Sequence, residues 1–108
     1  MEQNKAAAMI GLAMKAGKIA GGEFAAERAV KTGEAKLVIL SEDASRNTVK
    51  KFTDIAVYRK IPCCRFLNKT ELGRTVGKGE RSCLAVTDEG LAQSILNKIE
   101  TSTIQDKH

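Results

Sequence analysis

The stretch GGEFAAERAVKTGEAKLVIL (residues 21–40) decides the fold of this chain. Paired glycines precede a run of helix-forming residues, and Gly33 ends that run, because glycine is favoured just past the C-terminus of a helix. The segment KLVIL at residues 36–40 is continuously apolar after its first residue, which is typical of a central strand covered on both faces. The stretch therefore predicts a short helix that leads directly into a buried strand.

The sequence on both sides continues this alternation of helices and strands. Residues 3–16 predict a helix that ends at Gly17, and residues 18–20 predict a short edge strand. After the polar turn SEDAS, a helix that begins near residue 45 or 47 ends before Pro62. The remaining predicted elements are a strand at 63–67, a short helix at 71–76, the loop GKGERS at 77–82, a strand at 83–86 and a final helix capped by Asp88.

This order of elements predicts a three-layer α/β/α sandwich. Helices between strands favour parallel crossovers, and continuously apolar strands need helices on both faces of the sheet. The chain has 108 residues, a length that suits one domain with one shared core. We expect a single domain over residues 1–100 and a frayed tail over residues 101–108.

The charge balance favours a polyanion as the partner. Lysine and arginine total 18 against 13 aspartate and glutamate residues, so the net charge is +5. No apolar run approaches the roughly 20 residues of a membrane-spanning helix, and the alanine-rich start lacks a cleavage-site pattern. We therefore expect a cytoplasmic protein that contacts no membrane.

The three cysteines suit a reducing compartment. Cys63 and Cys64 are adjacent and too close for an ordinary disulfide, and the pleat of a strand places at least one of them in the core. We interpret both, together with Cys83, as packing residues. The only histidine is His108, on a polar tail, so the ligand set for zinc is incomplete and we expect no metal and no cofactor.

Two features invite an enzymatic interpretation. Glu42 and Asp43 follow the central strand, where α/β proteins place active sites, but no nucleophile or base stands beside them. The segment GRTVGKGE is faintly similar to a phosphate-binding loop, yet its glycine spacing is too short and no serine or threonine follows its lysine. We favour a solvated turn over catalysis, since an enzyme would need a deep pocket at that edge of the sheet.

The helix that follows Gly21 and Gly22 offers a candidate binding site at its N-terminus. The first turn of a helix exposes unpaired N–H groups and a partial positive charge, which can accept a phosphate or a base edge. Arg28 and Lys31 lie away from the apolar face of this helix, and Lys18 borders the same surface. The alternative is a solvated helix face on which the glycines form only a turn.

The order of five motifs resembles that of a known family. The segments GKIAGG, ERAVKTGEAKLVILSEDAS, KIPC, ELGRTVGK and LAVTDEG follow one another as in the L-seven-Ae and L-thirty-e ribosomal protein superfamily, in particular its small bacterial YlxQ-like members. The likeness covers residues 7–96, and GEAKLVILSEDAS is its most specific part. It implies an L-thirty-e-like sandwich with a small mixed sheet. It also implies RNA binding, because better-known members insert the start of the second helix at tandem sheared G·A pairs of kink-turn RNA.

The resemblance carries over only in part to the recognition motif of the family, glycine-threonine-asparagine-glutamate. This motif falls on residues 22–25, where Gly22 alone matches. Phe24 and Ala25 cannot supply the base-edge hydrogen bonds that asparagine and glutamate make. Phe24 either stacks on an unpaired base or turns into the core, and the scarcity of aromatic residues favours the core.

The other matched positions keep charged residues. Arg28 corresponds to a basic residue of the family, and Glu42 and Asp43 keep its acidic pair. The loop before the last strand is usually apolar in kink-turn binders but is charged here, and we expect Arg81 to face solvent as Arg28 does. The predicted RNA-binding residues are Lys18, Gly21, Gly22, Glu23, Phe24, Arg28, Lys31, Glu42, Asp43, Lys78 and Arg81.

These observations predict a non-enzymatic, monomeric RNA-binding protein, ribosomal or ribosome-associated, that docks the helix start and the 77–82 loop on structured RNA. Kink-turn RNA is one target that the resemblance implies. The altered motif favours nonspecific or shape-directed contact over tight kink-turn recognition. The alternative is a protein-interaction module of the same fold that has lost specific RNA recognition.

Overall fold

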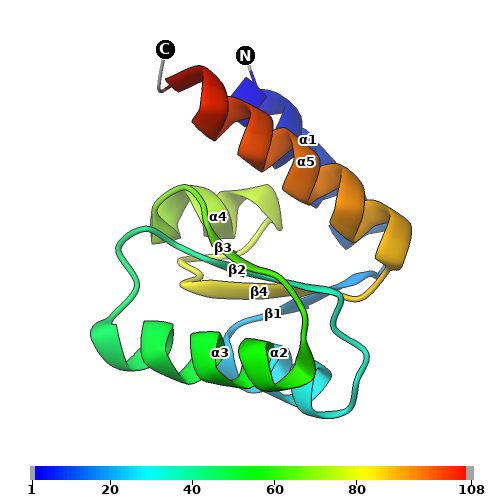
Figure 1. Ribbon diagram of the computed structural model, residues 1–108. Coiled ribbons are helices and arrows are strands. Elements are labelled where there is room, and N and C mark those ends of the chain that lie inside the picture. The colour runs from blue at the N-terminus through cyan, green and yellow to red at the C-terminus, as the bar shows by residue number, and fades with distance from the viewer. Residues whose placement is uncertain (1, 107–108) are drawn as a thin grey trace.

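The computed structural model describes the backbone of residues 2–106 and the side chains of residues 5–100. Within that range a four-stranded sheet of order β1-β4-β2-β3 lies between two layers of helices (Figure 1). The predicted α/β/α sandwich is confirmed. The elements are α1 (Glu2–Lys15), β1 (Ile19–Gly21), α2 (Glu23–Lys31), β2 (Leu37–Leu40), α3 (Arg46–Arg59), β3 (Cys63–Arg65), α4 (Lys69–Thr75), β4 (Cys83–Val86) and α5 (Glu89–Asp106).

The sheet is mixed, as the family resemblance implied. β2 and β3 pair in parallel, whereas β4 pairs antiparallel with both β1 and β2. The parallel crossovers expected from the alternation of elements are therefore wrong for β4. The reason is that α4 and the 77–82 loop keep the chain at the end of the sheet where β2 and β3 finish. β4 therefore starts at that end and runs between β1 and β2 in the direction opposite to theirs.

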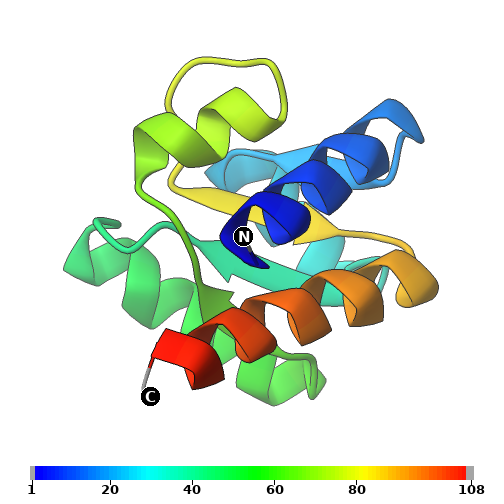
Figure 2. The same cartoon turned by 90° about the horizontal axis from the view of Figure 1, so that it is seen from above.

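Alternate residues of the central strands face two separate cores, so the expectation of one shared core is wrong: the sheet separates the two. Leu37 and Ile39 of β2 pack on the side of α1, α4 and α5, while Val38 and Leu40 pack on the side of α2 and α3. All four are fully buried, which explains the continuous apolar run in the sequence. Seen from above, α1 and α5 lie side by side across the sheet (Figure 2).

Side-chain caps fix where three of the described helices begin. The Ser45 hydroxyl accepts a hydrogen bond from the Thr48 amide of α3 at 3.2 Å, and the predicted cap Asp88 accepts one from an amide of α5 at 2.9 Å. Asn68 and Glu71 form a reciprocal capping box at α4. That box starts α4 two residues before the predicted position, a shift that apolar periodicity does not reveal.

The last helix extends to Asp106, so the backbone of residues 101–106 is helical where the sequence suggested fraying. No proline or glycine follows Gly90 to stop it. The domain boundary at residue 100 stays a prediction, and residues 107–108, including His108, lie outside the described residues. None of the helices described is long and apolar enough to cross a bilayer.

Candidate nucleic-acid interface

Helix α2 begins without a side-chain cap. Its N-cap residue is Gly22, with φ 92° and ψ 163°, a backbone conformation that favours glycine. The Gly22 amide donates to the Cys83 carbonyl at 3.0 Å, and its carbonyl accepts from the Ala26 amide at 2.9 Å. The helix is thereby tied to β4, while no side chain of the described residues caps its first turn. We call residues 22–25 the open start of α2.

The side chain of Arg81 lies against the two glycines. A Cβ atom at Gly21 would lie 3.7 Å from Arg81 Nε, and one at Gly22 would lie 3.9 Å from it. Arg81 is half-buried, and its Nη1 donates to the Glu80 carbonyl at 2.9 Å. The expectation that Arg81 faces solvent is therefore wrong, because the loop returns beside β1 and the arginine stem covers bare glycine backbone.

The 77–82 loop is held next to the open start of α2 by its own backbone. The Lys78 amide donates to the Gly73 carbonyl at 3.0 Å, and the Arg81 amide donates to the Lys69 carbonyl at 3.0 Å. Gly73 is buried, and a Cβ atom there would lie 1.9 Å from the Gly79 carbonyl oxygen. The loop thus packs directly on α4 and leaves Lys78 exposed at its turn.

A shallow pocket of about 260 Å³ lies on the α3 side of the open start. The Glu23 carboxylate accepts a hydrogen bond from Thr48 Oγ1 at 2.9 Å, and Asp43 Oδ1 accepts one from the Lys69 amide at 2.9 Å. Desolvation opposes the ionisation of Asp43, but the nearby Ser41 side chain and the hydrogen bond from the Lys69 amide together outweigh it and keep the Asp43 pKa below its ordinary value. The pocket is lined by Glu23, Asp43, Ala44, Ser45, Thr48, Lys69, Glu80 and Ser82.

This pocket is rich in hydrogen-bond acceptors. Glu23, Asp43 and Glu80 contribute carboxylates to it, whereas Lys69 is the one basic residue among the lining residues. Ionised carboxylates accept from amino groups at base edges and repel phosphates. The surface beside α2 is therefore acidic on the α3 side, which we call the acidic half. The other side carries Arg28, after which we call it the basic half, and Glu34 also lines it.

Phe24 and Arg28 occupy the basic half. Phe24 is 82% exposed, so the expectation that it turns into the core is wrong. The reason is geometric, because the buried face of α2 is made by Ala26, Ala29 and Val30, and Phe24 lies on the opposite face. Arg28 is exposed as predicted and forms no ion pair with any described residue.

Lys31 belongs to an ion-pair network on the α3 side of α2. Its Nζ lies 2.7 Å from Glu27 Oε2, and Lys51 Nζ lies 3.0 Å from Glu27 Oε1. Hydrogen bonds from Lys31 and Lys51 hold the pKa of Glu27 below its usual value. The charge of Lys31 is thus partly neutralised, which separates it from the neighbouring Arg28.

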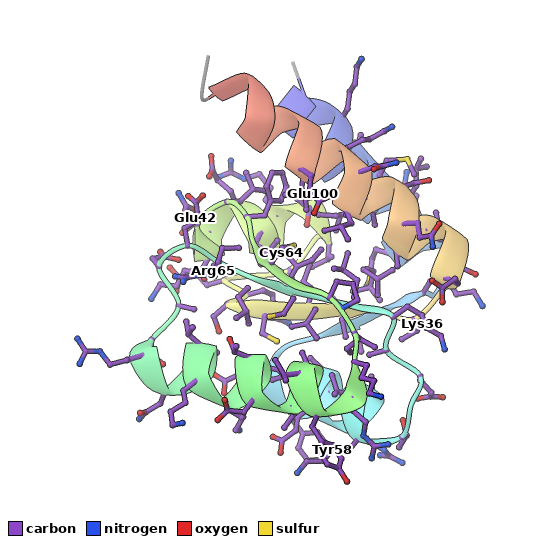
Figure 3. The ribbon with its side chains drawn as sticks, in the orientation of Figure 1. Lys36, Glu42, Tyr58, Cys64, Arg65 and Glu100 are labelled. Atoms are coloured by element: carbon purple, nitrogen blue, oxygen red, sulfur yellow. The ribbon has the colours of Figure 1, made fainter. Side chains whose placement is uncertain are left out.

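The remaining predicted residues lie at the margins of the surface. Lys18 is exposed at the opposite end of β1 from Gly21. Glu42 is exposed, and its backbone carbonyl accepts from Arg65 Nη2 at 2.7 Å; Figure 3 shows these two residues together at one end of the sheet. Glu42 does not line the pocket that contains Asp43, so the acidic pair is split.

Apart from Glu23 and Asp43, the residues that line the acidic pocket were not among the predicted site residues, although Glu80 and Ser82 lie in the predicted 77–82 loop. Thr48 donates to Glu23 from α3, Lys69 provides a backbone amide to Asp43, and Ser82 comes from the end of the loop. Their residue types carry no signal of their own in this sequence. Only the packing of α2 against α3 and of the loop against α4 brings them together.

The thiols are protonated packing groups at neutral pH. Cys83 is buried, and Cys64 and Cys63 pack against the cores on opposite faces of the sheet. Burial raises the pKa of all three thiols, that of Cys64 to about 12. Among the described residues, no three His, Cys, Asp or Glu side chains lie close enough together to hold a metal ion.

The mixed four-stranded sheet and the five helices described define a small α/β/α sandwich domain, with an uncapped helix start beside a charged loop. Residues 4–96 match the model of the "Ribosomal protein L7Ae/L30e/S12e/Gadd45 family", and the chain belongs to this family. The resemblance drawn from the order of motifs is thereby confirmed, including its YlxQ-like character.

Similar proteins agree with this placement. The chain is 40% identical over 92 residues to the RNA-binding protein YlxQ of Bacillus subtilis (strain 168), which covers 85% of the chain and 92% of that protein. It is 36% identical over 98 residues to YlxQ of Enterococcus faecium, covering 91% and 94%. A solved protein of unknown function from Bacillus halodurans superimposes with a TM-score of 0.86 at 36% identity, covering 89% and 97%. The Giardia lamblia 15.5kD RNA binding protein shares the fold, with a TM-score of 0.79 at 20% identity, covering 94% and 90%.

Proposed function

We propose that this chain binds structured RNA through the open start of α2 and the 77–82 loop. The observation that carries the proposal is the open start itself, beside an Arg28 that forms no ion pair with any described residue. Exposed amides at a helix N-terminus accept phosphate oxygens, and a neighbouring guanidinium adds a charge-assisted contact. Relatives at 36% and 40% identity are named RNA-binding proteins, and the net charge of +5 suits such a partner.

The two halves of the surface take different parts of the RNA in this proposal. The amides of residues 23–25, with Arg28, Lys18 and Lys78, contact phosphates. Glu23 and Asp43, on the acidic half, accept hydrogen bonds from amino groups of bases in a widened groove. The acidic half faces bases and the basic half faces the backbone, so the RNA is oriented on the protein.

The altered recognition motif limits the expected selectivity. Phe24 and Ala25 stand where the family resemblance implies asparagine and glutamate, whose base-edge contacts are each worth about 1–3 kcal/mol of discrimination. We therefore propose shape-directed binding, to ribosomal or kink-turn-containing RNA, by a monomeric and non-enzymatic protein. A cytoplasmic setting suits the three free thiols, which a reducing compartment preserves.

The test is the affinity of matched variants for a kink-turn RNA and for a copy whose G·A pairs are replaced by Watson–Crick pairs. With four to six phosphate contacts, the log–log salt slope is about −4 to −5 for duplex RNA, by analogy with duplex DNA. Arg28→Glu with Lys78→Glu removes about two contacts. This double variant should reduce the magnitude of the salt slope by about two and weaken RNA binding about 30-fold at 0.15 M salt.

The control is Lys36→Glu with Lys50→Glu, which makes the same charge change away from the proposed surface. It should bind nearly as the parent does. Equal loss in both double variants would mean that only net charge matters, and the assigned surface would then be wrong. Preference of the parent for the intact kink turn would show retained recognition of that motif. A parent that binds neither RNA would favour the protein-interaction module.

A further inference from the structure

Phe24 is a large aromatic side chain held out in solvent at the open start of α2. A single exposed apolar side chain is normal on a protein surface and needs no explanation by itself. Two hollows, however, flank this one. Phe24 and Arg28 line a hollow of about 330 Å³ together with Glu34 and Thr87. They also line a hollow of about 280 Å³ with Thr32 and with Glu27 and Lys31, which pair with each other.

The spacing of Phe24 and Arg28 places both on one face of α2. Residues four apart on a helix are neighbours, so the ring and the guanidinium project from adjacent turns. At ~30 Å³ per water, each hollow has room for about ten waters, which is ample for a planar heterocycle. An aromatic ring and a guanidinium plane are the two groups on which proteins stack unpaired bases.

A second exposed aromatic residue shows what is particular to Phe24. Tyr58 of α3 is 81% exposed, on the side of the α2–α3 layer away from the sheet (Figure 3). Its ring already lies 5.8 Å from the Arg59 guanidinium, and Arg59 donates to the Lys31 carbonyl at 2.6 Å. The guanidinium next to Tyr58 is therefore already hydrogen-bonded within the protein, whereas that of Arg28 has no ion pair with a described residue and can contact a ligand.

We propose that Phe24 is a stacking platform for an unpaired nucleobase of the bound RNA, with Arg28 on the adjoining phosphate. The proposal rests on the RNA-binding function proposed above and deepens it. It means that the chain has exchanged hydrogen-bond readout at this position for stacking. Stacking tolerates any base, because every base has a π face. The site therefore selects an unpaired nucleotide and not a particular sequence.

The experiment uses a kink-turn RNA that carries 2-aminopurine at one unpaired position at a time, since stacking quenches the fluorescence of this base. The full chain is compared with Phe24→Ala, Phe24→Trp and the matched control Tyr58→Ala. We expect one position at which the parent, Phe24→Trp and Tyr58→Ala quench the fluorescence and Phe24→Ala does not. Loss of one stacked base should weaken the binding of Phe24→Ala about 5- to 150-fold.

An abasic nucleotide at the same position completes the test. It should weaken the parent by the same factor as Phe24→Ala and should weaken Phe24→Ala no further, because both changes remove one contact. If Phe24→Ala binds and quenches as the parent does at every position, the stacking proposal is overturned. The RNA-binding surface then still stands, provided that Arg28→Glu with Lys78→Glu weakens binding. A parent that binds no RNA would overturn both proposals.

Discussion

The start of α2 differs from the starts of α3, α4 and α5. Ser45, Asn68 and Asp88 each accept a hydrogen bond from a first-turn amide of their helix, whereas Gly22 has no side chain to do so. A side-chain cap contributes about 1 kcal/mol to stability relative to alanine, but only a few tenths of a kcal/mol relative to glycine. The lack of a side-chain cap at Gly22 therefore costs the chain little stability and leaves the first-turn amides of α2 uncapped. The uncapped N-terminus is therefore particular to α2 among these four helices and is not a general property of the fold.

The cations of α2 and α3 show the same division. Lys50 and Lys51 of α3 pair with Asp54 and Glu27 at 3.1 and 3.0 Å, while Arg28 of α2 pairs with no carboxylate of the described residues. Exposed ion pairs contribute little to stability, but they remove charge from a surface. The positive charge of Arg28, beside Phe24, is therefore not neutralised by any described carboxylate, whereas the charges of Lys50 and Lys51 on α3 are.

Displacing the loop from the open start should have the largest effect. In Gly73→Ala the new Cβ would lie 1.9 Å from the Gly79 carbonyl oxygen, so backbone must move. We expect the free energy of unfolding to fall by about 3 kcal/mol or more, and RNA affinity to fall with it, although α2 is untouched. Chemical denaturation and a binding titration measure the two effects. The control Gly79→Ala, whose Cβ meets nothing within 4 Å, should lose under about 1 kcal/mol.

Closing the open start by a backbone change should have the next largest effect. Gly22→Ala forces a Cβ onto a residue with φ 92°, which should cost about 1–3 kcal/mol and disturb the first-turn amides. Gly21→Ala is the matched control, because its nearest contacts of 3.6 and 3.7 Å are ordinary. Thermal unfolding of both variants separates them. Equal stability would mean that the backbone conformation at Gly22 is not needed.

Removing a cap from a neighbouring helix should have a smaller and purely structural effect. Ser45→Ala deletes the acceptor for the Thr48 amide and should lower the free energy of unfolding by about 1 kcal/mol. RNA affinity should stay within twofold of the parent, although Ser45 borders the acidic pocket. A large loss of affinity without loss of stability would move the binding surface towards the start of α3.

The ion-pair network should give the smallest effect on stability, one that is present at neutral pH and disappears in acid. Glu27 has a pKa below its ordinary value of 4.5 because Lys31 and Lys51 donate to it. A lowered pKa in the folded state contributes stability above the unfolded-state pKa, and this contribution is lost as pH falls through the folded-state value. Lys51→Ala should therefore be slightly less stable than the parent at pH 7 and equal to it near pH 3 in urea titrations. Arg28→Ala should show no such pH dependence.

Most of the fold could be predicted from the sequence because its central strand and its helix caps have clear local patterns. The run at residues 36–40 had to be a central strand because it is apolar on both pleat faces, and β2 is buried throughout. Asp88 is a strong N-cap residue and caps α5 as predicted. The direction of β4 could not be predicted from the sequence. The alternation of helices and strands does not show whether a connection crosses to the other end of the sheet or returns at the same end.

Side-chain directions in the site were harder to predict. Gly22 and Arg28 were placed correctly because each depends on local helix geometry. Phe24 was misplaced because a nine-residue helix needs only three small residues to cover its part of the sheet, which leaves an aromatic side chain outside. Arg81 lies against Gly21 and Gly22, which are 60 and 59 residues away, and such packing leaves no local pattern in a sequence. The ion pair of Lys31 with Glu27 spans only four residues, so the i,i+4 spacing in the sequence could have revealed it.

The most direct test of the open start is an amide-resolved NMR titration of the ¹⁵N-labelled chain with kink-turn RNA. We expect the amide signals of Glu23, Phe24 and Ala25 and those of the 77–82 loop to shift the most. The first-turn amides of α3 and α5, already bound to Ser45 and Asp88, should remain in place. Shifts centred instead on the groove between β3 and α5, with the signals of residues 23–25 unchanged, would show that the open start of α2 does not bind RNA.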